Sequence, residues 1–235
     1  MFDWLFPRCC YICRTEISPD AMFCAKCFSE LVFIDSPICS RCGKLLPTPN
    51  SLEEYQICVD CSVNDKIHFD AGRALLLYND LSRRIIFQIK KRADIGATRT
   101  CVRMLVIRFG PIVGNADLII PVPSHWTQNL IRGYNPPSII ANELSKLLGI
   151  QVDNSLKRIR KTESQSNKTI AERIENVNSA FSYQGRLTGQ RILLVDDVRT
   201  TGATLNECAR ILKLTGASFI TCITIATTSI KDTKI

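Results

Sequence analysis

The segment RILLVDDVRTTGATLNECARILKL, residues 191–214, joins a run of apolar residues to an amphipathic stretch through a short polar turn. Residues 191–195 predict a buried β-strand, and residues 205–214 have apolar side chains at helical spacing. A second apolar strand is predicted at residues 218–226, beyond Gly216. A strand, a helix and a strand in this order form a βαβ unit, so the sequence predicts an α/β protein with a mostly parallel sheet covered by helices on both faces.

The chain before this unit alternates in the same way. Strands are predicted at residues 72–78 and 117–122, and helices at residues 81–91, 98–108 and 139–148, the last of which ends at Gly149. Thr169 and Glu172 have the spacing of a capping box for a short helix that ends near residue 177. Residues 157–168 precede it, are charged and have no apolar face, so we expect a mobile loop there.

The polar turn after the strand at residues 191–195 carries groups suited to binding a ligand. Asp196 and Asp197 follow this strand, at the edge of the sheet where open α/β proteins bind ligands. The next residues supply backbone N–H groups, hydroxyls and a glycine at the start of a helix, whose dipole favours an anion: Thr200, Thr201, Gly202, Ala203 and Thr204. Carboxylates beside a phosphate-binding turn suit a sugar phosphate, whereas an ordinary acidic turn would explain fewer of these features.

The first 61 residues contain nine of the twelve cysteines, and eight of the nine form four C-x-x-C pairs. Two such pairs supply the four thiolates of a closed tetrahedral zinc site, so the sequence predicts one or two structural zinc ions rather than redox disulfides or an iron–sulfur cluster. Sequential pairing would give two sets, although a crossed arrangement fits the spacing too: Cys10, Cys13, Cys24 and Cys27, then Cys39, Cys42, Cys58 and Cys61. The other four are predicted to be core residues or spectators: Cys9, Cys101, Cys208 and Cys222.

Composition divides the chain into a zinc-ribbon module, residues 1–66, and a larger domain, residues 67–235, with a polar linker near residues 60–70. Residues 1–70 carry a net charge of −4 and residues 71–235 a net charge of +12, which suits a phosphorylated ligand or a nucleic acid but also an ordinary solvated surface. No apolar run approaches the ~18 residues of a membrane helix, and the amino terminus lacks a signal-peptide cleavage site. We therefore expect a cytoplasmic protein without membrane insertion.

The acid pair with TTGAT resembles the phosphoribosyl-pyrophosphate (PRPP) signature of type I phosphoribosyltransferases. Further matching segments are residues 117–123 (DLIIPVP), 132–135 (RGYN) and 158–165 (RIRKTESQ), with Arg173, Asn176, Asn178 and Phe181. Together with the four C-x-x-C pairs, they make the chain similar to the ComF family of competence-associated proteins, which join a zinc ribbon to a phosphoribosyltransferase domain. Pro136 departs from the family pattern, which has glutamine at this position.

The resemblance implies a type I phosphoribosyltransferase fold that binds PRPP with Mg²⁺. It makes Asp196 and Asp197 the catalytic pair that accepts hydrogen bonds from the ribose hydroxyls, and residues 200–204 the 5′-phosphate loop. Arg132 would contact the pyrophosphate. The basic residues of the expected loop at residues 157–168 would belong to a flexible lid or bind nucleic acid: Lys157, Arg158, Arg160, Lys161 and Lys168.

The sequence is compatible with three functions. The first is transfer of ribose 5-phosphate to an unidentified nitrogen base, and the second is the handling of single-stranded DNA during natural transformation. The second function would use Lys90, Lys91 and Arg92, with Trp126 and Tyr134 as stacking residues. The third makes the zinc ribbon a docking surface for a helicase or channel protein of DNA uptake. The sequence names no general base, because His68 and His125 are interpreted as surface residues.

Overall fold

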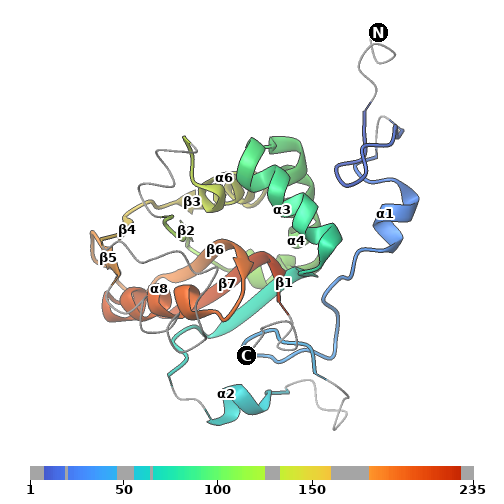
Figure 1. The fold of residues 1–235 in the computed structure, drawn as a ribbon. Coiled ribbons are helices and arrows are strands. Elements are labelled where there is room, and N and C mark those ends of the chain that lie inside the picture. The colour runs from blue at the N-terminus through green and yellow to red at the C-terminus, as the bar shows by residue number, and fades with distance from the viewer. Residues whose placement is uncertain are drawn as a thin grey trace.

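The computed structural model describes residues 8–18, 21–46, 56–63, 66–124, 133–159 and 180–228. A five-stranded sheet in the order β1-β7-β6-β2-β3 forms the centre of the larger domain (Figure 1). All neighbouring strands in it run parallel. Its strands are β1 (Ala71–Leu77), β2 (Leu118–Pro121), β3 (Gln151–Val152), β6 (Arg191–Arg199) and β7 (Phe219–Thr227).

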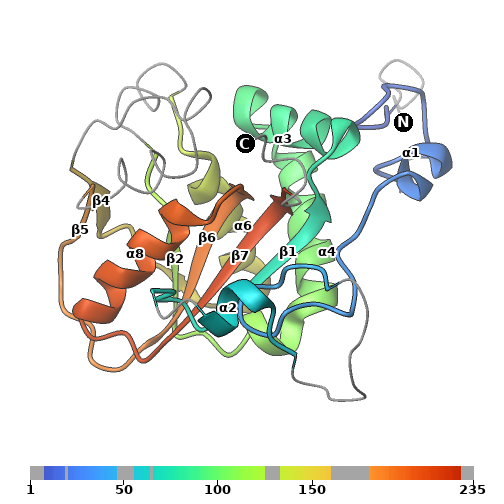
Figure 2. The same cartoon turned by 60° about the horizontal axis from the view of Figure 1, so that its bottom comes forward.

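Helices cover both faces of this sheet, as predicted. One face packs on α3 (Asp80–Arg92), α4 (Ile95–Val113) and α6 (Pro136–Leu148), and the other on α8 (Ala203–Leu214) (Figure 2). Side chains along β6 point alternately to the two faces of the sheet, so Leu193 and Val195 face α3, α4 and α6, while Ile192 and Leu194 face α8. The expected doubly covered α/β fold is therefore confirmed.

The predicted strand at residues 191–195 is longer in the structure. β6 continues to Arg199, because its backbone pairs with β7 as far as Thr227. Asp196 and Asp197 consequently lie within a paired strand rather than after it. The helix predicted at residues 98–108 is longer as well, since the Asp94 side chain caps the start of α4 by accepting a 3.0 Å hydrogen bond from the Ala97 N–H.

A small antiparallel pair, β4 (Leu156–Arg158) and β5 (Phe181–Tyr183), lies beside the main sheet. Lys157 and Arg158 belong to β4, so the prediction of a mobile loop is wrong for these two residues. The guanidinium of Arg158 lies 5.5 Å from the centroid of the Phe181 ring, which holds the basic side chain against the pair. Ile159 continues this pairing, since its N–H donates a 2.8 Å hydrogen bond to the Ala180 carbonyl. Residues 160–168 of the predicted loop and the short helix expected after it lie outside the described residues.

The amino-terminal region forms two small cysteine-rich units, with the short helices α1 (Ala25–Ser29) and α2 (Val59–Val63). Between them the chain covers the open edge of β1. Phe33 forms an antiparallel bridge with Leu76, and the N–H of Ile34 donates a 3.0 Å hydrogen bond to the Leu75 carbonyl. This pairing protects an edge strand that would otherwise present unpaired backbone groups.

The segment near residues 60–70, predicted to form a polar linker, has exposed residues but also packs against the larger domain at its carboxyl end. Cys61 lies in α2 and Phe69 is buried in the cluster beneath α8. The carboxylate of Asp70 accepts a 2.7 Å hydrogen bond from the Ile220 N–H and pairs with Lys213 at 2.8 Å. The second cysteine-rich unit is thereby joined to the start of β7.

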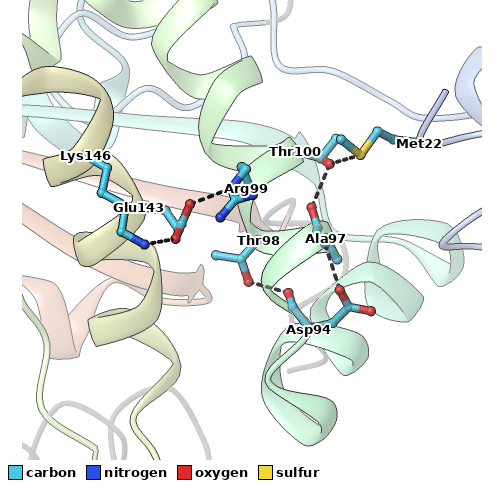
Figure 3. Close-up of polar contacts among 9 residues, drawn as sticks. Met22, Asp94, Ala97, Thr98, Arg99, Thr100, Glu143 and Lys146 are labelled. Carbon is cyan, nitrogen blue, oxygen red and sulfur yellow. Dashed lines mark hydrogen bonds and ion pairs between the residues drawn. The ribbon is translucent and has the colours of Figure 1, made fainter. Parts of the chain in front are cut away.

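A polar contact connects α4 with α6 (Figure 3). The Glu143 side chain is only 6% exposed, and its oxygens accept hydrogen bonds from Arg99 at 2.9 Å and Lys146 at 2.6 Å. The hydrogen bond from Arg99 is the main cause that holds the pKa of Glu143 below its usual value. Met22 of the first cysteine-rich unit contacts Thr100 of the same helix, so α4 connects that unit to α6.

Within the described parts of the chain, none of the helices combines the length and the apolar character needed to cross a bilayer.

Candidate functional site

The acid pair lies near the carboxyl end of the central strand β6. Asp197 is buried, with 7% of its surface exposed, whereas Asp196 is partly exposed. The Asp196 carboxylate accepts a 2.8 Å hydrogen bond from the N–H of Asp197. Two neighbouring carboxyls in a buried strand cost free energy unless they are compensated, so their surroundings decide what they can do.

Burial, followed by the negative charge of Asp197, raises the pKa of Asp196 to about 7. Lys90 and Arg158 oppose this shift with their positive charges. The Asp196 carboxyl therefore binds a proton more readily than an ordinary aspartate does. Such a perturbed group at a ligand-binding edge of a sheet is typical of a functional site.

Lys90 makes the ion pair of the site. Its Nζ lies 3.0 Å from Oδ1 of Asp197. Figure 2 shows α3, which carries Lys90 in its last turn, above the arrowheads of the central strands. The sequence grouped Lys90 with Lys91 as nucleic-acid contacts, but the structure separates them, because Lys91 is exposed to solvent.

The phosphate-binding turn predicted at residues 200–204 lies directly after β6. Gly202 has φ +80°, a conformation that favours glycine, and α8 begins at the next residue. The Thr201 hydroxyl accepts a 3.3 Å hydrogen bond from the Ala203 N–H at the start of this helix. Ala203 and Thr204 belong to the first turn of α8, whose N–H groups are directed toward an incoming anion. The structure thus places the turn next to the acid pair, as predicted.

The loop after β2 is held at its base by Asn135. The side-chain amide of Asn135 donates a 3.1 Å hydrogen bond to the Val122 carbonyl and accepts hydrogen bonds from the N–H and hydroxyl of Ser124. The hydroxyl of Tyr134 accepts a 3.0 Å hydrogen bond from the N–H of Ala93, at the end of α3. Tyr134 was predicted as a stacking residue, yet here it connects this loop to the helix of Lys90.

Pro136, which departs from the family pattern, is the first residue of α6 and is buried. Proline suits this position because the first helical N–H has no partner within the helix. Several residues predicted for the site lie outside the described residues: Arg132, Arg160, Lys161 and Lys168, with His125 and Trp126.

Arg158 faces the acid pair from β4. Its side chain is half-buried beside Phe181, and its charge acts on Asp196 and on Cys208 of α8. Burial lowers the pKa of Arg158 below its usual value, while Asp196 raises it. The residue was predicted as a lid or nucleic-acid contact; in the structure its guanidinium packs over the Phe181 ring, and its charge acts on Asp196.

The eight paired cysteines form two clusters, in the sequential arrangement: Cys10, Cys13, Cys24 and Cys27, then Cys39, Cys42, Cys58 and Cys61. All sulfur atoms within each cluster lie within 4.8 Å of one another, and the two distances between neighbouring pairs, Cys13 to Cys24 and Cys42 to Cys58, are both 3.7 Å. A tetrahedral zinc ion with Zn–S bonds of ~2.3 Å separates its sulfurs by about 3.8 Å. Both clusters therefore fit structural zinc.

Backbone hydrogen bonds in the second cluster also suit a metal-bound thiolate. The backbone N–H groups of Cys42 and Cys58 donate to the Cys39 sulfur at 3.4 and 3.3 Å. The cysteines predicted as core residues, Cys101, Cys208 and Cys222, are buried in apolar clusters, and Cys9 lies outside both sites.

The second cysteine cluster lies against the sheet of the larger domain. Arg199, at the end of β6, donates a hydrogen bond to the Cys42 carbonyl, and Arg73 of β1 donates one of 3.0 Å to the Ser40 carbonyl. Gly43, at φ +70°, comes so close that a Cβ there would lie 2.1 Å from the Gly72 carbonyl oxygen. The first of these contacts joins the zinc site to the strand that carries the acids.

Comparisons with known proteins agree with this architecture. A family model described as a double zinc ribbon domain matches residues 1–62, and one described as a phosphoribosyl transferase domain matches residues 132–234. A solved purine phosphoribosyltransferase from Pyrococcus horikoshii has 20% sequence identity and a TM-score of 0.35, covering 55% of this chain and 80% of that one.

Curated relatives match most of the chain. Competence protein F of Haemophilus influenzae is 28% identical, over 84% of this chain and 93% of the relative. Competence protein ComFC of Bacillus subtilis is 27% identical, over 83% of this chain and 80% of the relative. The DNA utilization protein YhgH of Escherichia coli O157:H7 is 26% identical, over 91% and 94%. Over most of its length the chain is thus similar to competence proteins of the ComF type, with a double zinc ribbon domain before a phosphoribosyl transferase domain.

Proposed function

We propose that the carboxyl end of β6 binds PRPP together with Mg²⁺. The observation that carries this proposal is the adjacency of two carboxyls, Asp196 and Asp197, to the amino terminus of α8 across the turn at Gly202. Carboxylates accept hydrogen bonds from the vicinal hydroxyls of a ribose, while backbone N–H groups of the turn donate to its 5′-phosphate. Few small molecules other than a ribose phosphate need carboxylates and backbone N–H donors so close together.

Each residue of the site has a distinct task in this proposal. Asp196 and Asp197 orient the ribose, and the hydroxyls and N–H groups of residues 200–204 hold the 5′-phosphate. Mg²⁺ would arrive with the ligand, bound to its ribose and pyrophosphate oxygens, and would neutralise the charge of the pyrophosphate. Arg132, close to Asn135 in the sequence, is the proposed contact of the pyrophosphate.

Transfer of the ribose 5-phosphate to a nitrogen base is the enzymatic form of this proposal. The nitrogen would form a bond to the anomeric carbon while the bond to pyrophosphate breaks, and the acid pair would stabilise the positive charge that develops on the ribose. Release of pyrophosphate from PRPP, screened against nucleobases and other amines, measures this activity directly. A protein that binds PRPP without releasing pyrophosphate would use it as a ligand instead.

The role we propose for the ligand-bound protein is in DNA uptake, with handling of single-stranded DNA in the cytoplasm. The names of the relatives, which refer to competence and DNA utilization, support it. One structural observation also favours it: Phe87 on the outer face of α3 is 50% exposed, next to the exposed Arg84 and Lys91. An aromatic ring between cations suits the bases and phosphates of a single strand.

Fluorescence anisotropy with a labelled single strand tests the DNA role. Phe87→Ala and Lys91→Met are expected to weaken binding, and the control Arg103→Met on α4, also exposed, is expected to leave it unchanged. Affinity should fall steeply as salt rises, since phosphate contacts release counterions. An affinity for the strand that changes neither with salt nor in either variant would contradict this role.

A docking site for an uptake helicase or channel protein on the exposed Val59 and Val63 of α2 is a separate proposal.

Thermal unfolding of the zinc-loaded protein tests the ligand. Mg²⁺ with PRPP is expected to raise the melting temperature of the wild type, because a ligand that binds only the folded state stabilises it. The Asp196→Asn/Asp197→Asn double variant should show no ligand-dependent rise. A wild-type melting temperature that does not respond to PRPP at millimolar concentration would contradict the proposal.

A further inference from the structure

The contact between Lys90 and Asp197 joins two parts of the chain that are far apart in sequence. The ammonium of Lys90 lies 3.0 Å from Oδ1 of Asp197. The side chain of Asp197 is 10% exposed, whereas that of Lys90 is 34% exposed. An ion pair with a buried carboxylate is screened less by water than a surface pair, so it has a larger influence on the charge of its partner.

The fold holds Lys90 at this place. Ile86 and Ile89, which precede it on α3, are buried against the sheet, and the side chain of Asn79 caps the start of the helix. The helix ends at Ala93, whose N–H donates a hydrogen bond to the Tyr134 hydroxyl. Both ends of α3 are therefore fixed, and its last turn carries Lys90 to the acid pair.

The charges around Asp196 and Asp197 explain why the position of Lys90 matters for ligand binding. Asp196 and Asp197 would together present two negative charges to a ligand that is itself strongly anionic. Lys90 from α3 and Arg158 from β4 face them with positive charge, while Cys208 of α8 faces them as a thiol whose pKa is raised by burial. Lys90 touches the buried member of the pair directly, so it removes the largest part of the repulsion.

We propose that Lys90 is a positioning residue of the ribose-phosphate site, which holds the Asp197 carboxylate oriented so that its Oδ2 accepts a hydrogen bond from a ribose hydroxyl. The inference rests on the proposed function, because it assigns a role at that same site. Lys90 acts through Asp197 on the ribose. Its contribution should therefore be the same for PRPP and for ribose 5-phosphate, which lacks the pyrophosphate.

Calorimetric titration of the zinc-loaded full chain with each of these two ligands, in the presence of Mg²⁺, tests the inference. Lys90→Met is expected to weaken the binding of both ligands by about tenfold or more, the size of one lost charge-assisted contact. Lys90→Arg should restore most of the affinity, since it keeps the cation. Arg103→Met, which removes an exposed cation on α4, is the control and should bind both ligands as the wild type does.

A double-variant cycle separates this role from a general structural one. If Lys90 acts through Asp197, then Lys90→Met added to Asp197→Asn should cause no further loss of affinity. Thermal unfolding of each variant shows whether it is folded, and Lys90→Gln replaces Lys90→Met if the latter is not.

Three results would overturn the inference: wild-type affinity in folded Lys90→Met, a loss confined to PRPP, or a full further loss in the double variant. A wild type that binds neither ligand would instead overturn the proposed function, and this inference with it. The failure of one is thus distinguishable from the failure of the other.

Discussion

The guanidinium of Arg199 donates a hydrogen bond to the backbone carbonyl of Cys42, which joins the strand of the acid pair to a ligand of the second zinc site. Arg199 also donates a 3.1 Å hydrogen bond from Nε to the Thr227 hydroxyl, so its side chain is held from two directions. A zinc ion that fixes the turn at Cys42 would therefore also fix the position of Arg199, immediately before the turn that we propose binds phosphate.

The first prediction concerns this connection. Cys39→Ser, which removes a ligand of the second site, should weaken PRPP binding by about tenfold, because the carbonyls that orient Arg199 and Arg73 lose their fixed geometry. Cys13→Ser, at the first site, is the control and should have a smaller effect, since that unit contacts α4 through Met22 and Thr100. Equal affinities of the two variants for PRPP, measured by titration, would show that this connection does not contribute to the free energy of PRPP binding.

Metal content provides the second prediction. The purified chain should contain two zinc ions, and Cys13→Ser and Cys39→Ser should each contain one, because the clusters share no ligand. Cys9→Ser should keep both ions. Mass spectrometry of the metals measures these values. A wild type with one ion, or one with iron in place of zinc, would contradict the assignment.

The third prediction is a dependence of stability on pH. The pKa of Asp196 is raised to about 7 in the folded protein, mainly by burial, whereas an unfolded aspartate has a pKa near 3.8. Its contribution to stability is therefore complete below the unfolded pKa and is lost as the pH rises through the folded pKa. Between pH 5 and pH 8 the wild type should lose more stability than Asp196→Asn does. Urea unfolding at both pH values measures the difference, and parallel losses would contradict the shift.

The fourth prediction concerns the contact between α4 and α6. Glu143→Gln should lower the free energy of unfolding at pH 7 by about 1–2 kcal/mol, since a buried carboxylate loses its charge-assisted hydrogen bonds to Arg99 and Lys146. The lowered pKa of Glu143 means that this contribution is present above the unfolded pKa and is lost as the pH falls through the folded one. The wild type and the variant should therefore converge below about pH 4. Arg103→Met, on the exposed face of α4, is the control.

Local patterns were sufficient to predict the central part of the fold. Neighbouring residues encode the apolar strand β6, the turn at Gly202 and the helix α8 that follows it, through their hydrophobic spacing and residue types. The four C-x-x-C pairs predicted the zinc sites, although their spacing left the pairing open, because only the fold brings Cys13 near Cys24. Each of these features depends on residues close together in the chain.

Contacts between distant residues account for what the sequence did not predict. Asp196 and Asp197 have side chains that are unfavourable in strands, yet β6 includes them because β7 pairs alongside. The bridge of Phe33 to Leu76 is too short to have a period. The ion pair of Lys90 with Asp197 depends on where α3 ends relative to β6, which no local pattern specifies.

The most direct test of the central claim is a calorimetric titration of the zinc-loaded protein with PRPP and Mg²⁺. The account predicts one binding site per chain in the wild type, and no measurable binding in the Asp196→Asn/Asp197→Asn variant. Wild-type binding that persists unchanged in that variant would place the ligand elsewhere and contradict the assignment of the acid pair.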